Sequence, residues 1–115
     1  MNNVTLFNLT GNFFIMNSQS HPILNEMSDQ LPETSITYKY IQGPETFSQV
    51  VTQAKEEFLC LSDLDADRGN GLSARDQLVK YGYGDLLEDL EEEDRMVLIG
   101  TLKLIIELAE ELAEE

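Results

Sequence analysis

Three aspartates alternate with other residues in a polar stretch near the middle of the chain. Asp63, Asp65 and Asp67 are spaced so that a loop could turn three carboxylate oxygens toward one hard cation. Because calcium takes oxygen ligands in proteins, we consider Asp63, Asp65 and Asp67 as candidate calcium ligands.

Residues 63–76 resemble the calcium-binding loop of the EF-hand family, which starts with oxygen ligands at alternate positions and lies between two helices. The stretch departs from the family pattern at Arg68, where the family has glycine, and at Ala74, where it has glutamate. An insertion of two residues would make Asp76 the last ligand, with a shorter side chain than glutamate. The resemblance implies calcium binding by Asp63, Asp65, Asp67 and Asp76. The alternative is that the aspartates are solvated and that Ser73 and Asp76 cap the next helix.

Other residues that could do chemistry are few. Cys60 lies in an apolar stretch, residues 58–61, where a thiol is usually a small buried side chain. His21 precedes Pro22 at an expected helix start. The sequence contains none of the short motifs of serine hydrolases, zinc proteases or nucleotide-binding loops. We therefore expect a protein that is not an enzyme and that needs no cofactor, calcium excepted.

The composition of the chain is that of a globular protein with a strong acidic excess. Its 115 residues suit a single domain, and 42% of them are hydrophobic. There are 22 acidic against 7 Lys and Arg residues, for a formal net charge of −15. Nucleic acids and anionic membranes would repel such a chain, so we expect neither as a direct partner. A single cysteine, no long apolar run and no basic leader favour a cytoplasmic location.

The acidic residues are concentrated in the second half of the chain. Residues 58–115 hold sixteen acidic and five basic residues, and the segment 85–94 alone holds seven carboxylates. A second acidic cluster closes the sequence. We interpret these carboxylates as a partner-binding surface, although they could also serve solubility alone. The predicted partner-binding residues are Asp85, Glu88, Asp89, Glu91, Glu92, Glu93, Asp94, Glu107, Glu111 and Glu115.

Carboxylates on one helix face can reproduce the charge spacing of a nucleic acid. Side chains four residues apart lie about 6 Å from each other, comparable to the separation of phosphates along one DNA strand. Glu88 with Glu92, and Glu107 with Glu111 and Glu115, are the rows that we expect to do this. In composition the chain is similar to nucleic-acid-mimicking inhibitors of phages and mobile elements, and to immunity proteins. We therefore expect a basic, nucleic-acid-binding protein as its partner.

The first half of the sequence predicts strands and helices together. Alternating residues in 4–9 and an apolar run in 13–16, joined by turn residues 10–12, favour a β-hairpin. A helix is expected from a Ser20 cap to Pro32, a third strand over 35–42, and an amphipathic helix over 45–60. The predicted fold is α+β, with a short N-terminal antiparallel sheet of about three strands packed against helices.

The second half predicts helices after the polar loop. We expect a helix over 73–80 with a capping box, a short helix over 85–90 and a long acidic C-terminal helix over 92–114. We treat 1–115 as one domain, with a β-rich half, 1–61, and an acidic helical half, 62–115.

Residues 96–108 of the long helix are apolar on most sides, so that helix needs more than one packing neighbour. The sheet and the 73–90 helices could cover it, or a second subunit could pair with residues 96–112 in a homodimer. The dimer would fit a chaperone-like or antitoxin-like protein. The heptad-like seam of the helix is Leu98, Leu102, Ile105, Ala109 and Leu112.

Overall fold

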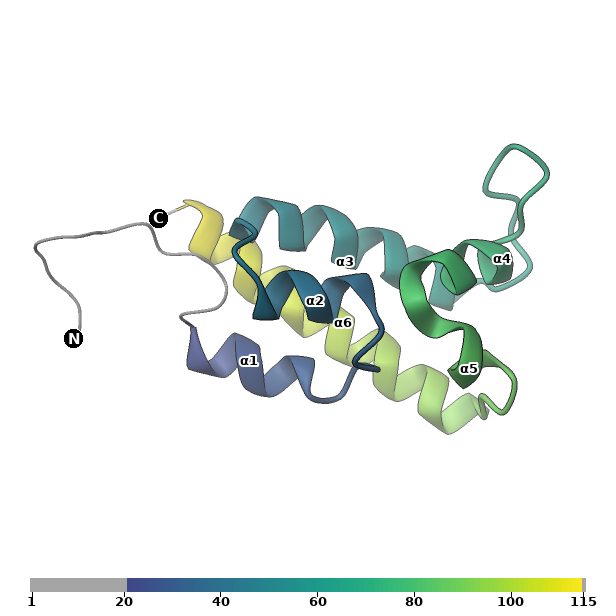
Figure 1. Ribbon diagram of the computed structural model, residues 1–115, viewed down its shortest axis with the longest axis horizontal. Coiled ribbons are helices and arrows are strands. Elements are labelled where there is room, and N and C mark those ends of the chain that lie inside the picture. The colour runs from purple at the N-terminus through teal and green to yellow at the C-terminus, as the bar shows by residue number, and fades with distance from the viewer. Residues whose placement is uncertain (1–20, 115) are drawn as a thin grey trace, which may run out of the picture.

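The computed structural model describes residues 21–114, and these residues form an assembly of helices (Figure 1). Two long helices, α3 and α6, are joined and flanked by short ones. A single turn of π-helix, η2, connects α4 to α5. The elements are α1 (Pro22–Ser28), α2 (Ile36–Gln42), α3 (Phe47–Ser62), α4 (Ala74–Leu78), η2 (Val79–Tyr83), α5 (Gly84–Leu87) and α6 (Glu92–Glu114).

The predicted α+β fold is wrong for the described residues, since residues 21–114 contain no strand and no sheet. The third strand expected over 35–42 is helix α2. Ser35 starts this helix, because its hydroxyl accepts a hydrogen bond from the backbone N–H of Tyr38 at 3.1 Å. One isolated antiparallel bridge joins Asp67 to Ser73. The predicted hairpin strands 4–9 and 13–16 lie outside the described residues.

Most of the predicted helices are confirmed, with shifted ends. The helix expected over 45–60 is α3, and the long C-terminal helix is α6. The predicted capping box at Ser73 and Asp76 is present at the start of α4. The N-cap of α1 is His21, whose Nδ1 atom accepts a hydrogen bond from Leu24 N at 3.3 Å. Ser20, the predicted cap, lies outside the described residues. None of the described helices is long and apolar enough to cross a membrane.

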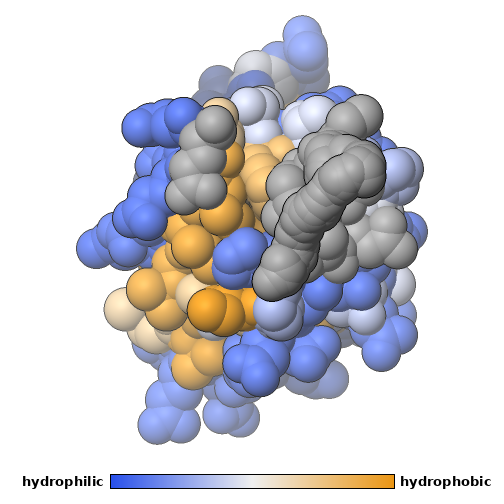
Figure 2. Space-filling view, turned by 90° about the vertical axis from the view of Figure 1, so that its left-hand side faces the viewer, coloured by the Kyte–Doolittle hydropathy of each residue, from blue (hydrophilic) through white to orange (hydrophobic). Residues whose placement is uncertain are grey.

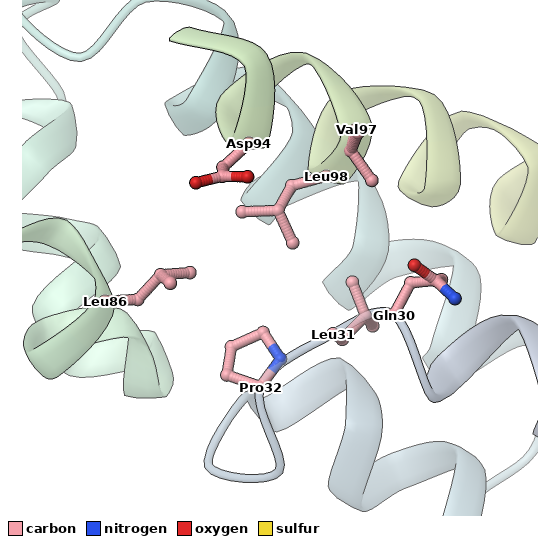
Figure 3. A pocket seen from close by; sticks show the side chains of 7 residues that line it. All are labelled: Gln30, Leu31, Pro32, Leu86, Asp94, Val97 and Leu98. Atoms are coloured by element: carbon pink, nitrogen blue, oxygen red, sulfur yellow. The ribbon is translucent and has the colours of Figure 1, made fainter. Parts of the chain in front are cut away.

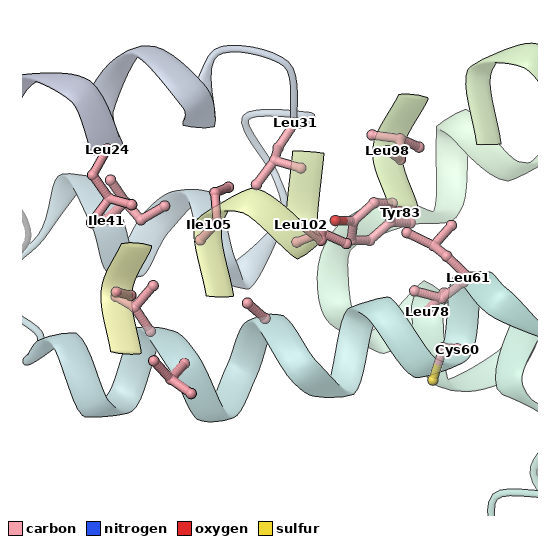
Figure 4. Packing of buried hydrophobic residues seen from close by; sticks show 14 of the residues in the cluster. Leu24, Leu31, Ile41, Cys60, Leu61, Leu78, Tyr83, Leu98, Leu102 and Ile105 are labelled. Atoms are coloured by element: carbon pink, nitrogen blue, oxygen red, sulfur yellow. The ribbon is translucent and has the colours of Figure 1, made fainter. Parts of the chain in front are cut away.

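The hydrophobic core lies chiefly between α3 and α6, and Figure 4 shows the packing of its side chains. Helix α1 packs against α6, while α2 and α4 pack against α3. Four of the five seam residues predicted on α6 are fully or almost fully buried by these contacts. The sequence left open whether a sheet with the 73–90 helices or a second subunit covers this seam. In the structure α3 and α1 of the same chain cover it. The four buried residues are Leu98, Leu102, Ile105 and Ala109.

Glu57 is a carboxylate buried in this core. It lies on the apolar face of α3 and is fully shielded from solvent. Its Oε1 atom accepts hydrogen bonds from the hydroxyls of Tyr83, at 2.7 Å, and Ser35, at 3.1 Å. Its Oε2 atom accepts from the backbone N–H of Thr37 at 3.0 Å and from the amide of Gln53 at 2.9 Å. One side chain of α3 thus holds the start of α2 and the end of η2.

A close backbone contact reinforces the same junction. Gly82 has a φ of 97°, which favours glycine, and its carbonyl accepts a hydrogen bond from the hydroxyl of Thr34. A Cβ atom at Gly82 would collide with the Thr34 backbone. Only glycine therefore lets the loop between α1 and α2 lie directly against η2.

We expect the Glu57→Ala substitution to lower the free energy of unfolding by at least about 2 kcal/mol. The change leaves the buried donors of Ser35, Thr37 and Tyr83 without an acceptor, and relief from burying a carboxylate offsets only part of this loss. Urea unfolding measures the effect. Glu26→Ala, at an exposed position of α1, is the control and should change the value by less than about 0.5 kcal/mol. Equal stabilities of the two variants would contradict this role of Glu57.

Glu57 should also make stability depend on pH. Burial raises the pKa of its carboxyl above the ordinary value of 4.5, and hydrogen bonds from Gln53, Tyr83 and Thr37 oppose this only in part. Above pH 4.5 the folded protein then binds more protons than the unfolded chain, so stability falls as pH rises toward the folded pKa. In urea unfolding, the wild-type protein should lose stability relative to Glu57→Gln between pH 4.5 and pH 7. Repulsion among the other carboxylates is common to both proteins and cancels. A constant difference would contradict the raised pKa.

Candidate partner-binding surface

The acidic segment 85–94 connects the end of α5 to the start of α6. All seven of its carboxylates are exposed, as a partner-binding surface requires. Glu88 directly follows α5 and Glu92 is the first residue of α6, so these two residues do not lie on one helix. The row predicted from Glu88 and Glu92 therefore lacks the helical spacing on which it was based. The exposed carboxylates are Asp85, Glu88, Asp89, Glu91, Glu92, Glu93 and Asp94.

Arg95 fixes this segment to the body of the protein. Its guanidinium forms a two-pronged ion pair with Glu92, with N···O distances of 2.7 and 3.1 Å, and the pair holds the pKa of Glu92 below its ordinary value. A further N–H of the same group donates to the backbone carbonyl of Leu61 near the end of α3. Glu92 is thus partly neutralised within the chain. The remaining carboxylates of the segment are better placed to attract a partner.

An open hollow of about 420 Å³ lies beside the acidic segment (Figure 3). Its walls come from the loop between α1 and α2, from α5 and from the start of α6. The side chains of Pro32, Leu86 and Leu98 point toward the same space, and the carboxylate of Asp94 lies at its edge. Sequence reasoning missed this hollow. The lining residues are Gln30, Leu31, Pro32, Leu86, Asp94, Val97 and Leu98.

The second acidic cluster lies at the other end of α6. Glu107 and Glu111 are exposed and keep the predicted helical spacing, while Glu115 lies outside the described residues. Glu110, on the same stretch, forms an ion pair with Lys55 of α3 at 3.1 Å. From Glu93 to Glu107 the helix rises about 20 Å, so the structure does not unite the two acidic clusters.

Viewed from the end where α1 begins and α6 ends, hydrophobic side chains form one area bordered by hydrophilic ones (Figure 2).

Three of the four predicted calcium ligands accept hydrogen bonds within or next to the loop. Carboxylates of Asp63 and Asp67 accept backbone N–H bonds within the loop, at 3.3 and 2.8 Å, and that of Asp76 accepts from Ser73 N at 3.2 Å. Asp65 and Asp67 line a small open depression. Within residues 21–114 no three acidic, histidine or cysteine side chains are arranged to hold a metal ion. The residues do not fit a calcium site in this arrangement, and the calcium titration at the end of this subsection tests the sequence-based prediction.

The two residues considered for catalysis have structural roles. His21 caps α1, as described above. Cys60 is fully buried, as predicted, and burial raises the pKa of its thiol, which keeps the sulfur protonated and unreactive.

Comparison of the chain with protein-family models, with curated proteins and with solved structures gave no match. The geometry of the surface therefore carries the functional argument. Exposed carboxylates next to an apolar hollow can attract a cationic protein surface over a distance and then bury an apolar side chain from it.

We expect the loop 63–76 to contribute stability through its helix cap, independently of calcium. Ser73→Ala should lower the free energy of unfolding by about 1 kcal/mol, because the backbone N–H of Asp76, in the first turn of α4, loses its acceptor. Millimolar calcium should leave the melting temperature of wild type and variant unchanged in differential scanning calorimetry. A calcium-dependent rise that is lost in Asp63→Ala or Asp65→Ala would instead establish the calcium site.

Proposed function

We propose that this protein is an acidic inhibitor or regulator that binds the basic surface of a protein that handles DNA or RNA. The carboxylates of segment 85–94 would take the place of nucleic-acid phosphates on that surface. The proposal assigns no reaction to the chain. It includes a cytoplasmic location, with which the free, buried thiol of Cys60 is compatible.

The observation that carries the proposal is the exposure of all seven carboxylates of this segment beside an apolar hollow. An acidic surface that served solubility alone would need no such hollow. An open hollow with mostly apolar walls and a carboxylate at its edge can accept one apolar side chain from a partner. Together the two features match a cationic surface that also presents an apolar side chain.

Charge supports the choice of a nucleic-acid-binding partner. A net charge of −15 on 115 residues attracts basic proteins and repels acidic ones. Grooves that bind nucleic acid are lined with Lys and Arg, because phosphate contacts dominate their affinity. Such a groove is an extended basic surface whose charge is complementary to that of the acidic segment. The approach would be accelerated by electrostatic steering, and salt would weaken it.

The test is capture of partners from cell lysate by the immobilised protein, with mass spectrometry to identify them. We expect a nucleic-acid-binding protein that is released by added double-stranded DNA and by raised salt. A triple variant, Glu88→Gln, Asp89→Asn and Glu91→Gln, should bind that protein on the order of tenfold more weakly, with a shallower salt dependence.

The matched control removes the same amount of charge from three other exposed positions. Glu26→Gln, Asp29→Asn and Asp65→Asn together should leave most of the affinity intact. Equal losses in both triple variants would show that only net charge matters. A captured protein that neither DNA nor salt displaces would contradict nucleic-acid mimicry and would favour the chaperone-like or antitoxin-like alternative.

A further inference from the structure

The outer face of α6, which is turned away from the core, combines exposed apolar side chains with acidic ends. In a helical projection at 100° per residue, six residues of this face point within about 40° of one direction. That direction is roughly opposite the buried seam of the same helix. Val97 and Leu104 are 52% and 54% exposed, and Met96 beside them is 54% exposed. The members of this outer face are Glu93, Val97, Gly100, Leu104, Glu107 and Glu111.

On this basis we propose that the partner docks an amphipathic helix along the outer face of α6, with Lys or Arg near both of its ends. The inference rests on the proposed function and specifies the element of the basic partner that makes the contact. An apolar stripe on such a helix would cover Val97 and Leu104, and its basic ends would meet Glu93 at one side and Glu107 and Glu111 at the other.

Gly100 supports a close approach at the centre of this face. Glycine in the interior of a helix is destabilising relative to alanine, so its presence in α6 has a cost. A Cβ atom added at Gly100 would meet nothing within 4 Å. The fold therefore does not require glycine here, whereas a second helix that crosses at this point would approach more closely without a side chain in the way.

The hollow beside the acidic segment extends the outer face. Val97 belongs to both, since it lines the hollow and lies between Glu93 and Gly100 along α6. An apolar side chain of the docked helix could therefore enter the hollow and contact Pro32 and Leu86. Such an anchor would slow dissociation of a complex that charge alone assembles.

Charge argues for a basic helix over a second copy of this chain. In an antiparallel pair of α6 helices that cross at Gly100, Glu93 of one copy would lie near Glu107 of the other. A parallel pair would place each acidic end beside its own counterpart. Both arrangements bring like charges together on proteins of net charge −15. Lys103 is exposed at the edge of the outer face, and its single positive charge does not offset the repulsion between the acidic ends of two copies.

The probe for this proposal is a synthetic helical peptide with leucines along one face and lysines in its first and last turns. The control peptide has the same composition in scrambled order, so its charge is identical. We expect the amphipathic peptide to bind at least about tenfold more tightly in fluorescence anisotropy. In nuclear magnetic resonance spectra of isotope-labelled protein, amide shifts should centre on Val97, Gly100 and Leu104.

Two variants distinguish docking from a structural role. Gly100→Ala should raise the melting temperature, because alanine favours the helix, and yet weaken peptide binding. Leu104→Gln should weaken peptide binding on the order of tenfold, while Leu59→Gln, at an exposed leucine of α3, should leave it unchanged.

Equal affinity of the two peptides, or shifts away from the outer face, would overturn the docked helix while leaving the charge-based function intact. Absence of peptide binding would also overturn it. A dimer in sedimentation that Leu104→Gln dissociates would assign the outer face to a second copy instead. Failure of the proposed function is a separate result, seen when lysate capture yields no nucleic-acid-binding protein although the peptide binds as expected.

Discussion

A buried carboxylate that needs hydrogen-bond donors from several parts of the chain is the constraint on which this fold depends. Within helix α3, Gln53 is the side chain that donates a hydrogen bond to the Glu57 carboxylate. The other donors are Ser35 and Thr37 at the start of α2, and Tyr83 at the end of η2. Because an unsatisfied buried charge is very costly, α2 and η2 must both reach the same side of α3. An all-apolar core would not impose this pairing, since hydrophobic contacts are not directional.

The sequence was sufficient for those helices whose apolar residues recur at spacings of three and four, namely α3 and α6. It failed over 35–42, where Ile36, Tyr38 and Tyr40 alternate as in a strand. The residues that the helix buries are Thr37 and Ile41, four positions apart, and one of them is polar. A hydrophobicity pattern discounts a buried threonine. The N-cap at Ser35 was the remaining local signal for a helix, and a strand interpretation ignores it.

The candidate surface was predictable in its charge and not in its shape. Exposure of the carboxylates follows from the cost of burying them, so their position on the surface could be predicted from the sequence. The hollow could not, because residues around Pro32, Leu86 and Val97 come together only through tertiary packing. Glu57 did leave a signal. It lies three residues after Ala54 and four before Leu61, so it shares the buried apolar face of α3 with them. An acidic residue at such a position is expected to be buried with hydrogen-bond partners.

The use of the few basic residues explains how a chain of this charge keeps acidic surfaces free. Lys55 of α3 pairs with Glu110 of α6, and Arg68 pairs with Glu56 of α3. Arg95 joins the start of α6 to the end of α3. Lys55 and Arg95 join helices that form the core, and Arg68 joins the loop after α3 back to that helix. Within the acidic segment Glu92 is paired with Arg95, and the other six carboxylates form no ion pair among the described residues. Repulsion among the solvent-exposed carboxylates lowers the free energy of unfolding of the free protein. A cationic partner that relieved this repulsion would gain binding free energy from it. Under the proposed function, the same repulsion that opposes folding of the free protein would favour binding of a cationic partner.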